Sequence, residues 1–152
     1  MNLPLLLDDA AWRSLTTSAR GALPREVGGI LLGCYTAAGP RVLAAPVVPD
    51  PQATRLRYQR DASAAERVLA EALRDDSSGT LGYLGEWHTH PLPVGPSGTD
   101  LQSMRRLAAD GDYDVMLLVL ALGPRGWVGH ARNAAPTGSV QTVSVSVEGY
   151  PA

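Results

Sequence analysis

Two histidines separated by one residue are the side chains in this sequence that are best placed to do chemistry. They occur in His88-Thr89-His90, at the end of an alternating, largely apolar segment. Side chains at positions i and i+2 of a β-strand point to the same face, so both imidazoles can reach one ion. Such a pair is suited to bind zinc. The alternative is that they are ordinary polar residues at a strand end.

A carboxylate follows the histidines at a useful distance. Asp100 lies ten positions after His90, in the first turn of an expected helix, and the loop from Pro91 to Pro96 contains three prolines and a glycine. A loop stiffened in this way can fold the helix start back over the strand end. Two nitrogens and one carboxylate oxygen would leave a fourth position for water, as in catalytic zinc sites. The sequence therefore predicts His88, His90 and Asp100 as metal ligands.

The segment Ser97-Gly-Thr-Asp100 also matches a capping box, a common start of a helix. Capping alone would explain both polar side chains. Capping and metal binding are compatible, because a helix N-terminus beside a metal also places backbone N–H groups near developing negative charge.

A hydrolytic zinc site also needs a base, and two glutamates are candidates. Glu86 precedes His88 by two residues and shares its strand face by parity. Glu26 is distant in the sequence, at the start of an apolar segment that continues with two glycines. Simple solvation at a strand end would also account for Glu26. The residues by themselves leave the choice between the two glutamates open.

Hydrophobic periodicity and turn residues predict the elements that position these side chains. Three helices are expected, the second of them opened by a capping box at Ser63, over about residues 9–22, 63–74 and 97–109. Strands are expected over residues 26–35, 41–48, 80–90, 113–122, 126–132 and 141–148, with a short one near Tyr58. This order predicts a single α+β domain (α/β in type) over residues 1–152, with a mixed sheet.

Composition narrows the class of protein. The net charge of −2 over 152 residues argues against a protein whose main work is binding nucleic acid. The longest apolar stretch, Val115 to Leu122, is too short to span a membrane. The apolar run of residues 1–7 lacks a basic region and is followed by two aspartates, so it does not resemble a signal peptide. With one cysteine, Cys34, and no possible intrachain disulfide, we expect a soluble cytoplasmic protein.

Together, these motifs resemble the active-site signature of the JAMM (MPN+, JAB, Mov34/PAD-1) zinc metalloprotease family. That signature is a glutamate leading a strand of the form E-x-x-G-apolar-apolar-x-G, then H-[ST]-H-P, then S-x-x-D. The corresponding segments here are Glu26 to Gly33, His88 to Pro91 and Ser97 to Asp100. The conjunction is far more specific than any one of the motifs.

The resemblance implies a curved mixed sheet flanked by about three helices, similar to cytidine deaminase. It also implies that His88, His90 and Asp100 bind Zn²⁺ and that Glu26 is the general acid and base. Ser97 would donate a hydrogen bond to the tetrahedral oxyanion, and Glu86 would have a supporting role. The loop from Pro91 to Pro96 is one residue shorter than the family's usual spacer, and this departure bears on Ser97.

Members of this family cleave the bond after the C-terminal glycine of ubiquitin or a ubiquitin-like protein. The short chain resembles bacterial, deubiquitinase-like members, which are sometimes found beside activating and conjugating enzymes in antiphage systems. The resemblance implies a ubiquitin-like substrate whose extended tail adds as a strand beside the site. The alternatives are a zinc amidase acting on a small substrate or a sulfur-carrier adduct, and a metal-free MPN scaffold. Arg55, Arg57 and Arg60 form either solvated surface or a contact for an acidic partner.

Overall fold

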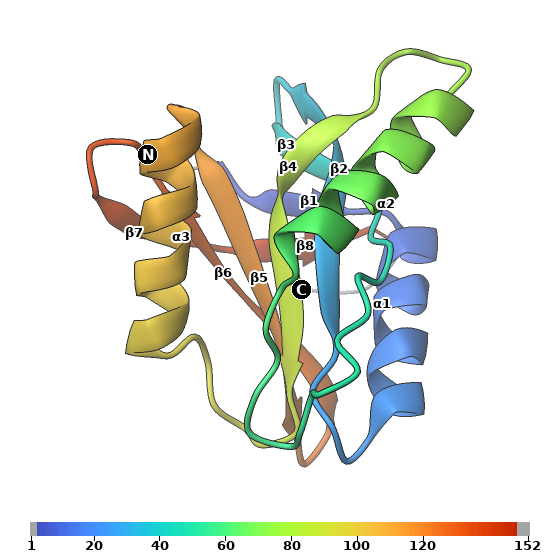
Figure 1. Ribbon diagram of the computed structural model, residues 1–152, viewed down its shortest axis with the longest axis vertical. Coiled ribbons are helices and arrows are strands. Elements are labelled where there is room, and N and C mark those ends of the chain that lie inside the picture. Colours follow the sequence, from blue (N-terminus) through green and yellow to red (C-terminus); the bar gives the residue numbers. More distant parts are fainter. Residues whose placement is uncertain (1–2, 149–152) are drawn as a thin grey trace.

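The computed structural model describes residues 3–148 (Figure 1). The predicted domain limits at residues 1 and 152, and the first two residues of the apolar run considered as a signal peptide, lie outside the described residues. Among residues 3–148, no helix combines the length and the apolarity needed to cross a lipid bilayer.

Three helices and eight strands make up the described part of the chain. The helices are α1 (Asp9–Ala22), α2 (Ala62–Asp75) and α3 (Gly98–Gly111). The strands are β1 (Leu5–Leu7), β2 (Gly28–Thr36), β3 (Gly39–Ala44), β4 (Gly82–His90), β5 (Val115–Gly123), β6 (Gly126–Ala134), β7 (Val140–Val143) and β8 (Val145–Val147). The predicted α+β class with about three helices is confirmed.

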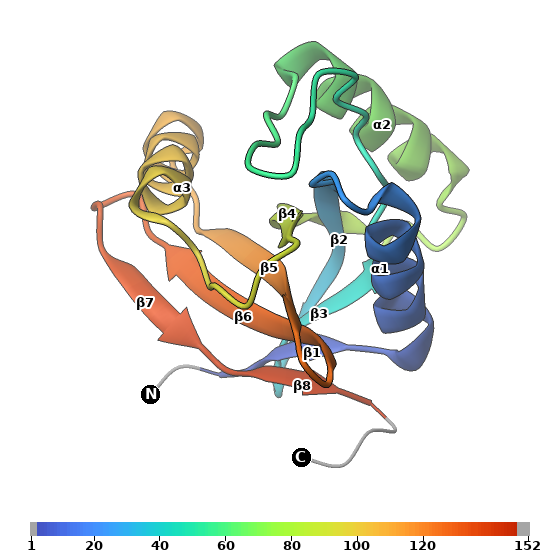
Figure 2. The same ribbon diagram turned by 90° about the horizontal axis from the view of Figure 1, so that it is seen from below.

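The strands form one mixed sheet in the order β7-β6-β5-β4-β2-β3-β1-β8. Strand β4 lies in its interior, antiparallel to β2 and parallel to β5. Strand β1 runs parallel to both β3 and β8, so segments from opposite ends of the described chain form one edge of the sheet. Figure 2 shows the sheet curling strongly from β7 round to β8, as the predicted curved sheet requires.

Each helix packs on the face of the sheet where apolar strand side chains point toward it. Alternate residues of β5 bury their side chains on opposite faces of the sheet. Leu117 packs in a cluster with α3, whereas Leu118 packs in the larger cluster that includes residues of α1. On β2, Ile30 likewise packs with α2. Helices α2 and α3 therefore lie on either side of β4 on the same face of the sheet (Figure 1).

The start of α2 differs from its prediction. Its N-cap is Asp61, whose side chain accepts a hydrogen bond from the backbone N–H of Ser63 at 3.1 Å. The predicted capping box with Ser63 as the cap is therefore wrong, because an equally good capping residue lies two positions earlier.

Three further differences concern strands. The expected strand near Tyr58 is only an isolated bridge between Thr54 and Arg57. The expected strand over residues 141–148 is divided into β7 and β8. Strand β1 was not predicted, because three consecutive leucines show no alternation and its partners lie far away in the sequence.

Candidate metal centre

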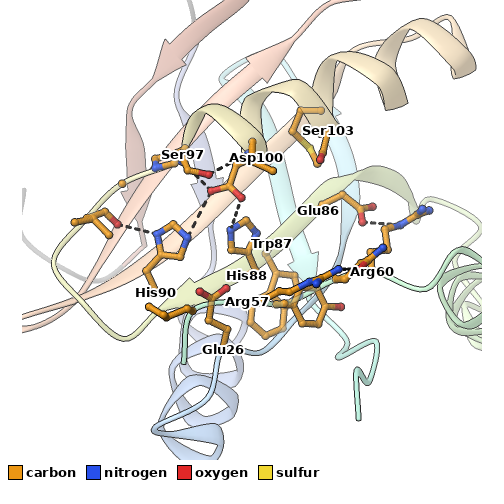
Figure 3. A pocket seen from close by; sticks show the side chains of 18 of the residues that line it. Glu26, Arg57, Arg60, Glu86, Trp87, His88, His90, Ser97, Asp100 and Ser103 are labelled. Carbon is orange, nitrogen blue, oxygen red and sulfur yellow. Dashed lines mark hydrogen bonds and ion pairs between the residues drawn. The ribbon is translucent and has the colours of Figure 1, made fainter. Parts of the chain in front are cut away.

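The two histidines of the predicted ligand set lie side by side at the end of β4. Their ring centroids are 5.0 Å apart, and both rings are partly buried. The register places His88 between Gly28 of β2 and Val119 of β5, so the strands on both sides hold this end of β4 in place. Both imidazoles point toward Asp100 (Figure 3) and line the cavity between residues 55–60 and α3.

Asp100 meets both histidines from the first turn of α3. Its Oδ1 lies 3.3 Å from Nε2 of His88, and its Oδ2 lies 3.5 Å from Nε2 of His90. Burial alone would raise the pKa of Asp100, but hydrogen bonds with the two histidines outweigh burial and hold that pKa well below its usual range. The structure thus brings the three predicted ligands into direct contact, with both Nε2 atoms directed at one carboxylate.

Glu26 reaches the histidines because of the register between β2 and β4. Gly28 is opposite His88, and just before it the backbone of Val27 exchanges hydrogen bonds with Thr89. This antiparallel alignment sets Glu26 beside His90, and one ligand atom each from Glu26, His88 and His90 lie within 4.8 Å of one another. Glu26 is 7% exposed, and burial raises its pKa against the opposing influence of the two histidines.

Glu86 shares the strand face of the histidines, but its carboxylate is already engaged. One oxygen lies 2.7 Å from Nε of Arg60, and the other accepts a hydrogen bond from the hydroxyl of Tyr83. Burial raises the pKa of Glu86 to about 7, although both partners act to lower it. The group of possible metal ligands that residues 3–148 bring together contains Glu26 and not Glu86.

Two contacts orient the histidines. Nδ1 of His90 lies 3.0 Å from the carbonyl oxygen of Val94, and because a carbonyl can only accept, this contact places the proton on Nδ1 and leaves Nε2 free to bind an ion. The ring of Tyr58 stacks against His88 with centroids 6.4 Å apart. Sequence reasoning missed both, since a backbone carbonyl has no side-chain signature and Tyr58 lies in a connector without periodicity.

Ser97 is the N-cap of α3, and the capping box predicted from the sequence is present. Its hydroxyl accepts a hydrogen bond from the N–H of Asp100 at 3.1 Å, and its own N–H donates to Oδ2 of Asp100 at 2.8 Å. The same carboxylate therefore caps the helix and faces the histidines. This double use holds the carboxylate of Asp100 against the histidines.

All five predicted site residues line one cavity of about 1100 Å³. Its floor is the end of β4, and its walls are the connector before α2, the proline loop after β4, and α3. In the view of Figure 3, Asp100 and Glu26 approach the histidine pair from opposite sides. Two imidazole nitrogens and nearby carboxylate oxygens form a donor set that suits a divalent ion such as zinc.

Comparison with known families agrees with this geometry. The model of a family described as prokaryotic homologs of the JAB domain matches residues 8–139. This chain belongs to that JAB (JAMM) family. The resemblance inferred from the sequence motifs is thereby confirmed.

Two relatives of this JAB-domain protein have the name CD-NTase/cGAS isopeptidase. The one from Enterobacter hormaechei subsp. hoffmannii (strain UCI 50) is 34% identical over 121 residues, covering 74% of this chain and 64% of the relative. The one from Pseudomonas aeruginosa (strain BWHPSA011 / Pa011) is 38% identical over 86 residues, covering 55% of this chain and 54% of the relative. The chain thus spans less than two thirds of the length of either relative.

A solved structure supports the fold of this JAB-domain protein. The solution structure of protein DSY2949 from Desulfitobacterium hafniense matches it with a TM-score of 0.70, covering 95% of this chain and 92% of that protein. The two sequences are only 22% identical, so the likeness concerns the fold.

Proposed function

We propose that this JAB-domain protein is a zinc-dependent isopeptidase, formed by a single domain over residues 1–152. The observation that carries the proposal is the convergence of His88, His90, Asp100 and Glu26 in one cavity of a JAB-family fold. Two relatives named CD-NTase/cGAS isopeptidase support it. The bond cleaved would be an isopeptide bond in a conjugate of a CD-NTase.

His88, His90 and Asp100 would hold the zinc ion. The Asp100 carboxylate lies 3.3 Å from Nε2 of His88 and 3.5 Å from Nε2 of His90. Its hydrogen bonds with Ser97 keep it in place. When bound, zinc supplies an acidified water and polarises the scissile carbonyl. Glu26, on the other side of the histidines, would be left free for proton transfer.

Glu26 would take the proton of the attacking water and pass it to the leaving amine. Its burial suits this role, because a raised pKa brings a carboxyl closer to the pH at which it must both accept and return a proton. The Ser97 hydroxyl would donate a hydrogen bond to the oxygen that gains negative charge, once it turns from the Asp100 N–H. His90, fixed by the Val94 carbonyl, stays aligned throughout.

The conjugate would contain an extended tail that ends in glycine, as in a ubiquitin-like protein. An extended tail would lie in the cavity beside the histidines, between residues 55–60 and α3. We further propose that the protein works in the cytoplasm, in a conjugation system with its own activating and conjugating enzymes, of the antiphage kind. A reducing compartment agrees with the single thiol of Cys34.

Metal analysis combined with cleavage of an isopeptide conjugate of the CD-NTase tests this function. We expect one zinc per chain and cleavage by the wild type. Glu26→Gln should keep the zinc and lose about 100-fold or more in kcat, because it removes the proton acceptor. His88→Ala should lose both zinc and cleavage.

Matched controls are available in the chain. Glu66→Gln changes an exposed glutamate of α2, and His130→Ala removes the third histidine, which does not line the cavity. Both should keep zinc and activity. Full cleavage by Glu26→Gln and His88→Ala would rule out the mechanism. Zinc binding without cleavage of any protein conjugate would instead favour an amidase that acts on a small substrate.

A further inference from the structure

A tight turn in the connector before α2 forms one edge of the cavity. We call residues 54–60 the connector lip. The N–H of Thr54 donates to the carbonyl of Arg57 at 2.9 Å, which closes the turn and puts Arg55 and Leu56 at its tip. Leu56 is 76% exposed, more than any other large apolar side chain of the described residues.

The connector lip contacts three residues that line the cavity, namely Glu26, His88 and Glu86. The carbonyl of Thr54 accepts a hydrogen bond from the N–H of Glu26 at 2.8 Å. Tyr58 stacks against His88, and its hydroxyl donates to the carbonyl of Val48 at 2.7 Å. At the far end of the lip, Arg60 pairs with the buried carboxylate of Glu86. The backbone of the lip, from which the exposed side chains of Arg55 and Leu56 project, is therefore held beside the site.

The connector lip presents positive charge that the protein does not neutralise. Within residues 3–148, Arg55 and Arg57 form no ion pair, and the guanidinium of Arg57 donates a hydrogen bond to the neutral side chain of Gln59. On the facing wall, the charges of Arg106 and Asp110 offset each other on adjacent turns of α3. The lining of the cavity as a whole holds four arginines and four acidic residues, and three of the four arginines belong to the lip.

Exposed apolar side chains complete the cavity mouth. Leu92 and Val94 of the proline loop are 54% and 52% exposed, and they line the same cavity as Leu56. Apolar side chains displayed on both edges of a cleft, beside unpaired arginines, are typical of a peptide-binding surface rather than of a site for a small polar substrate.

We propose that the connector lip selects a substrate tail that carries acidic residues. Arg55 and Arg57 would bind carboxylates of the tail just before its terminal glycine, and Leu56 would pack against an apolar residue between them. The inference rests on the proposed isopeptidase function. The arginines face the tail rather than the acceptor, because the released lysine amine becomes a cation that two arginines would repel.

Synthetic isopeptides test this selection. Each is an eight-residue tail ending in glycine and joined to the ε-amine of a lysine reporter, with either two glutamates, two glutamines or two lysines before the glycine. For the wild type, we expect kcat/KM to be about tenfold higher for the glutamate tail than for the glutamine tail, and lowest for the lysine tail. The double variant Arg55→Glu/Arg57→Glu should reverse this order, whereas Arg74→Glu, a charge reversal at the end of α2 away from the cavity, should not.

Binding provides a second readout that needs no turnover. The free glutamate tail, labelled with a fluorophore, should bind the zinc-loaded Glu26→Gln protein more tightly than the glutamine tail, and high salt should weaken that difference. Equal kcat/KM and equal binding for all tails would overturn the inference while leaving the isopeptidase function intact. If no tail is cleaved in a way that depends on Glu26, the proposed function is wrong. Equal binding of all tails in that case would show that the selection is wrong as well.

Discussion

At the scale of single residues, two glutamates face the same cavity and differ in their surroundings. Glu26 lies with the histidines, and among residues 3–148 its carboxylate forms no hydrogen bond or ion pair. Glu86 is enclosed, and both of its oxygens are engaged by Arg60 and Tyr83. A base must be free to exchange its proton, so the surroundings, and not the residue type, support the proposal that Glu26 is the base.

Ser97 caps α3, and its proposed role as an oxyanion donor can be tested separately from this capping. Glycine is nearly as good an N-cap as serine, so Ser97→Gly should lower the free energy of unfolding by only a few tenths of a kcal/mol. Loss of an oxyanion donor should lower kcat about 100-fold. Steady-state kinetics and thermal denaturation of the same samples measure the two effects. Ser103→Ala, on the same wall of the cavity, should change neither, and a fully active Ser97→Gly protein would reduce Ser97 to a helix cap.

The buried carboxyl of Glu86 should make stability depend on pH. Its pKa is raised from 4.5 to about 7, mainly by burial. A group with a raised pKa binds more protons in the folded than in the unfolded protein. Its stabilising contribution is therefore complete below pH 4.5 and is lost as the pH rises through about 7.

Glu86→Gln should remove this dependence. The free energy of unfolding of the wild type, minus that of the variant, should fall with rising pH by at most about 1.4 kcal/mol per pH unit over that range. Urea denaturation of both proteins at a series of pH values, with a chelator present, measures the difference. Two parallel curves would show that the carboxyl of Glu86 is ionised throughout.

At the scale of elements, the glycines of the first motif serve the packing of β2. A β-carbon on Gly29 would lie 1.9 Å from the carbonyl oxygen of Pro46, and one on Gly33 would lie 1.8 Å from that of Arg41. These are contacts with backbone, which cannot rotate away. The glycines therefore let neighbouring backbone pass close to β2, whose other edge holds the end of β4 with the histidines.

Gly29→Ala should therefore be strongly destabilising. We expect a loss of about 3 kcal/mol or more in the free energy of unfolding, because the strand or the segment at Pro46 must shift. Gly21→Ala is the matched control. It lies near the end of α1 with nothing within 4 Å of the added carbon, and it should stabilise the protein by up to about 1 kcal/mol. Chemical denaturation compares the two, and equal stabilities would contradict the packing argument.

At the scale of the whole molecule, strands from opposite ends of the described chain pair at one edge of the sheet. The N–H of Leu5 donates to the carbonyl of Ser144 at 2.8 Å, and β1 continues beside both β3 and β8. Leu5 and Leu7 are almost fully buried in the largest core cluster, which also contains Trp87 of β4. The short first strand thus supports the layer on which the site is built.

Leu5→Ala should consequently cost about 3 kcal/mol of unfolding free energy, because it leaves a cavity in that cluster. Leu3→Ala, at a side chain that is 52% exposed, should change stability by less than about 0.5 kcal/mol. Thermal denaturation of the two variants provides the comparison. Similar melting temperatures would mean that β1 is dispensable for the core.

The sequence by itself determined the candidate site residues of the two later motifs and the elements that hold them. Periodicity located the strand that ends in His88-Thr89-His90, and the capping box located the start of α3 at Ser97 and Asp100. Local signals sufficed because strand parity and helix capping depend on near neighbours.

Only the tertiary structure decided how distant segments meet. Strand register brought Glu26 to the histidines, and the pairing with Arg60 and Tyr83 withdrew Glu86 from them. The three-residue strand β1 and the stacking of Tyr58 on His88 were equally invisible in the sequence. Apart from the local contact of Tyr83 with Glu86, each depends on contacts between residues far apart in the chain, whose pairing is fixed by the packing of the whole sheet rather than by any local pattern.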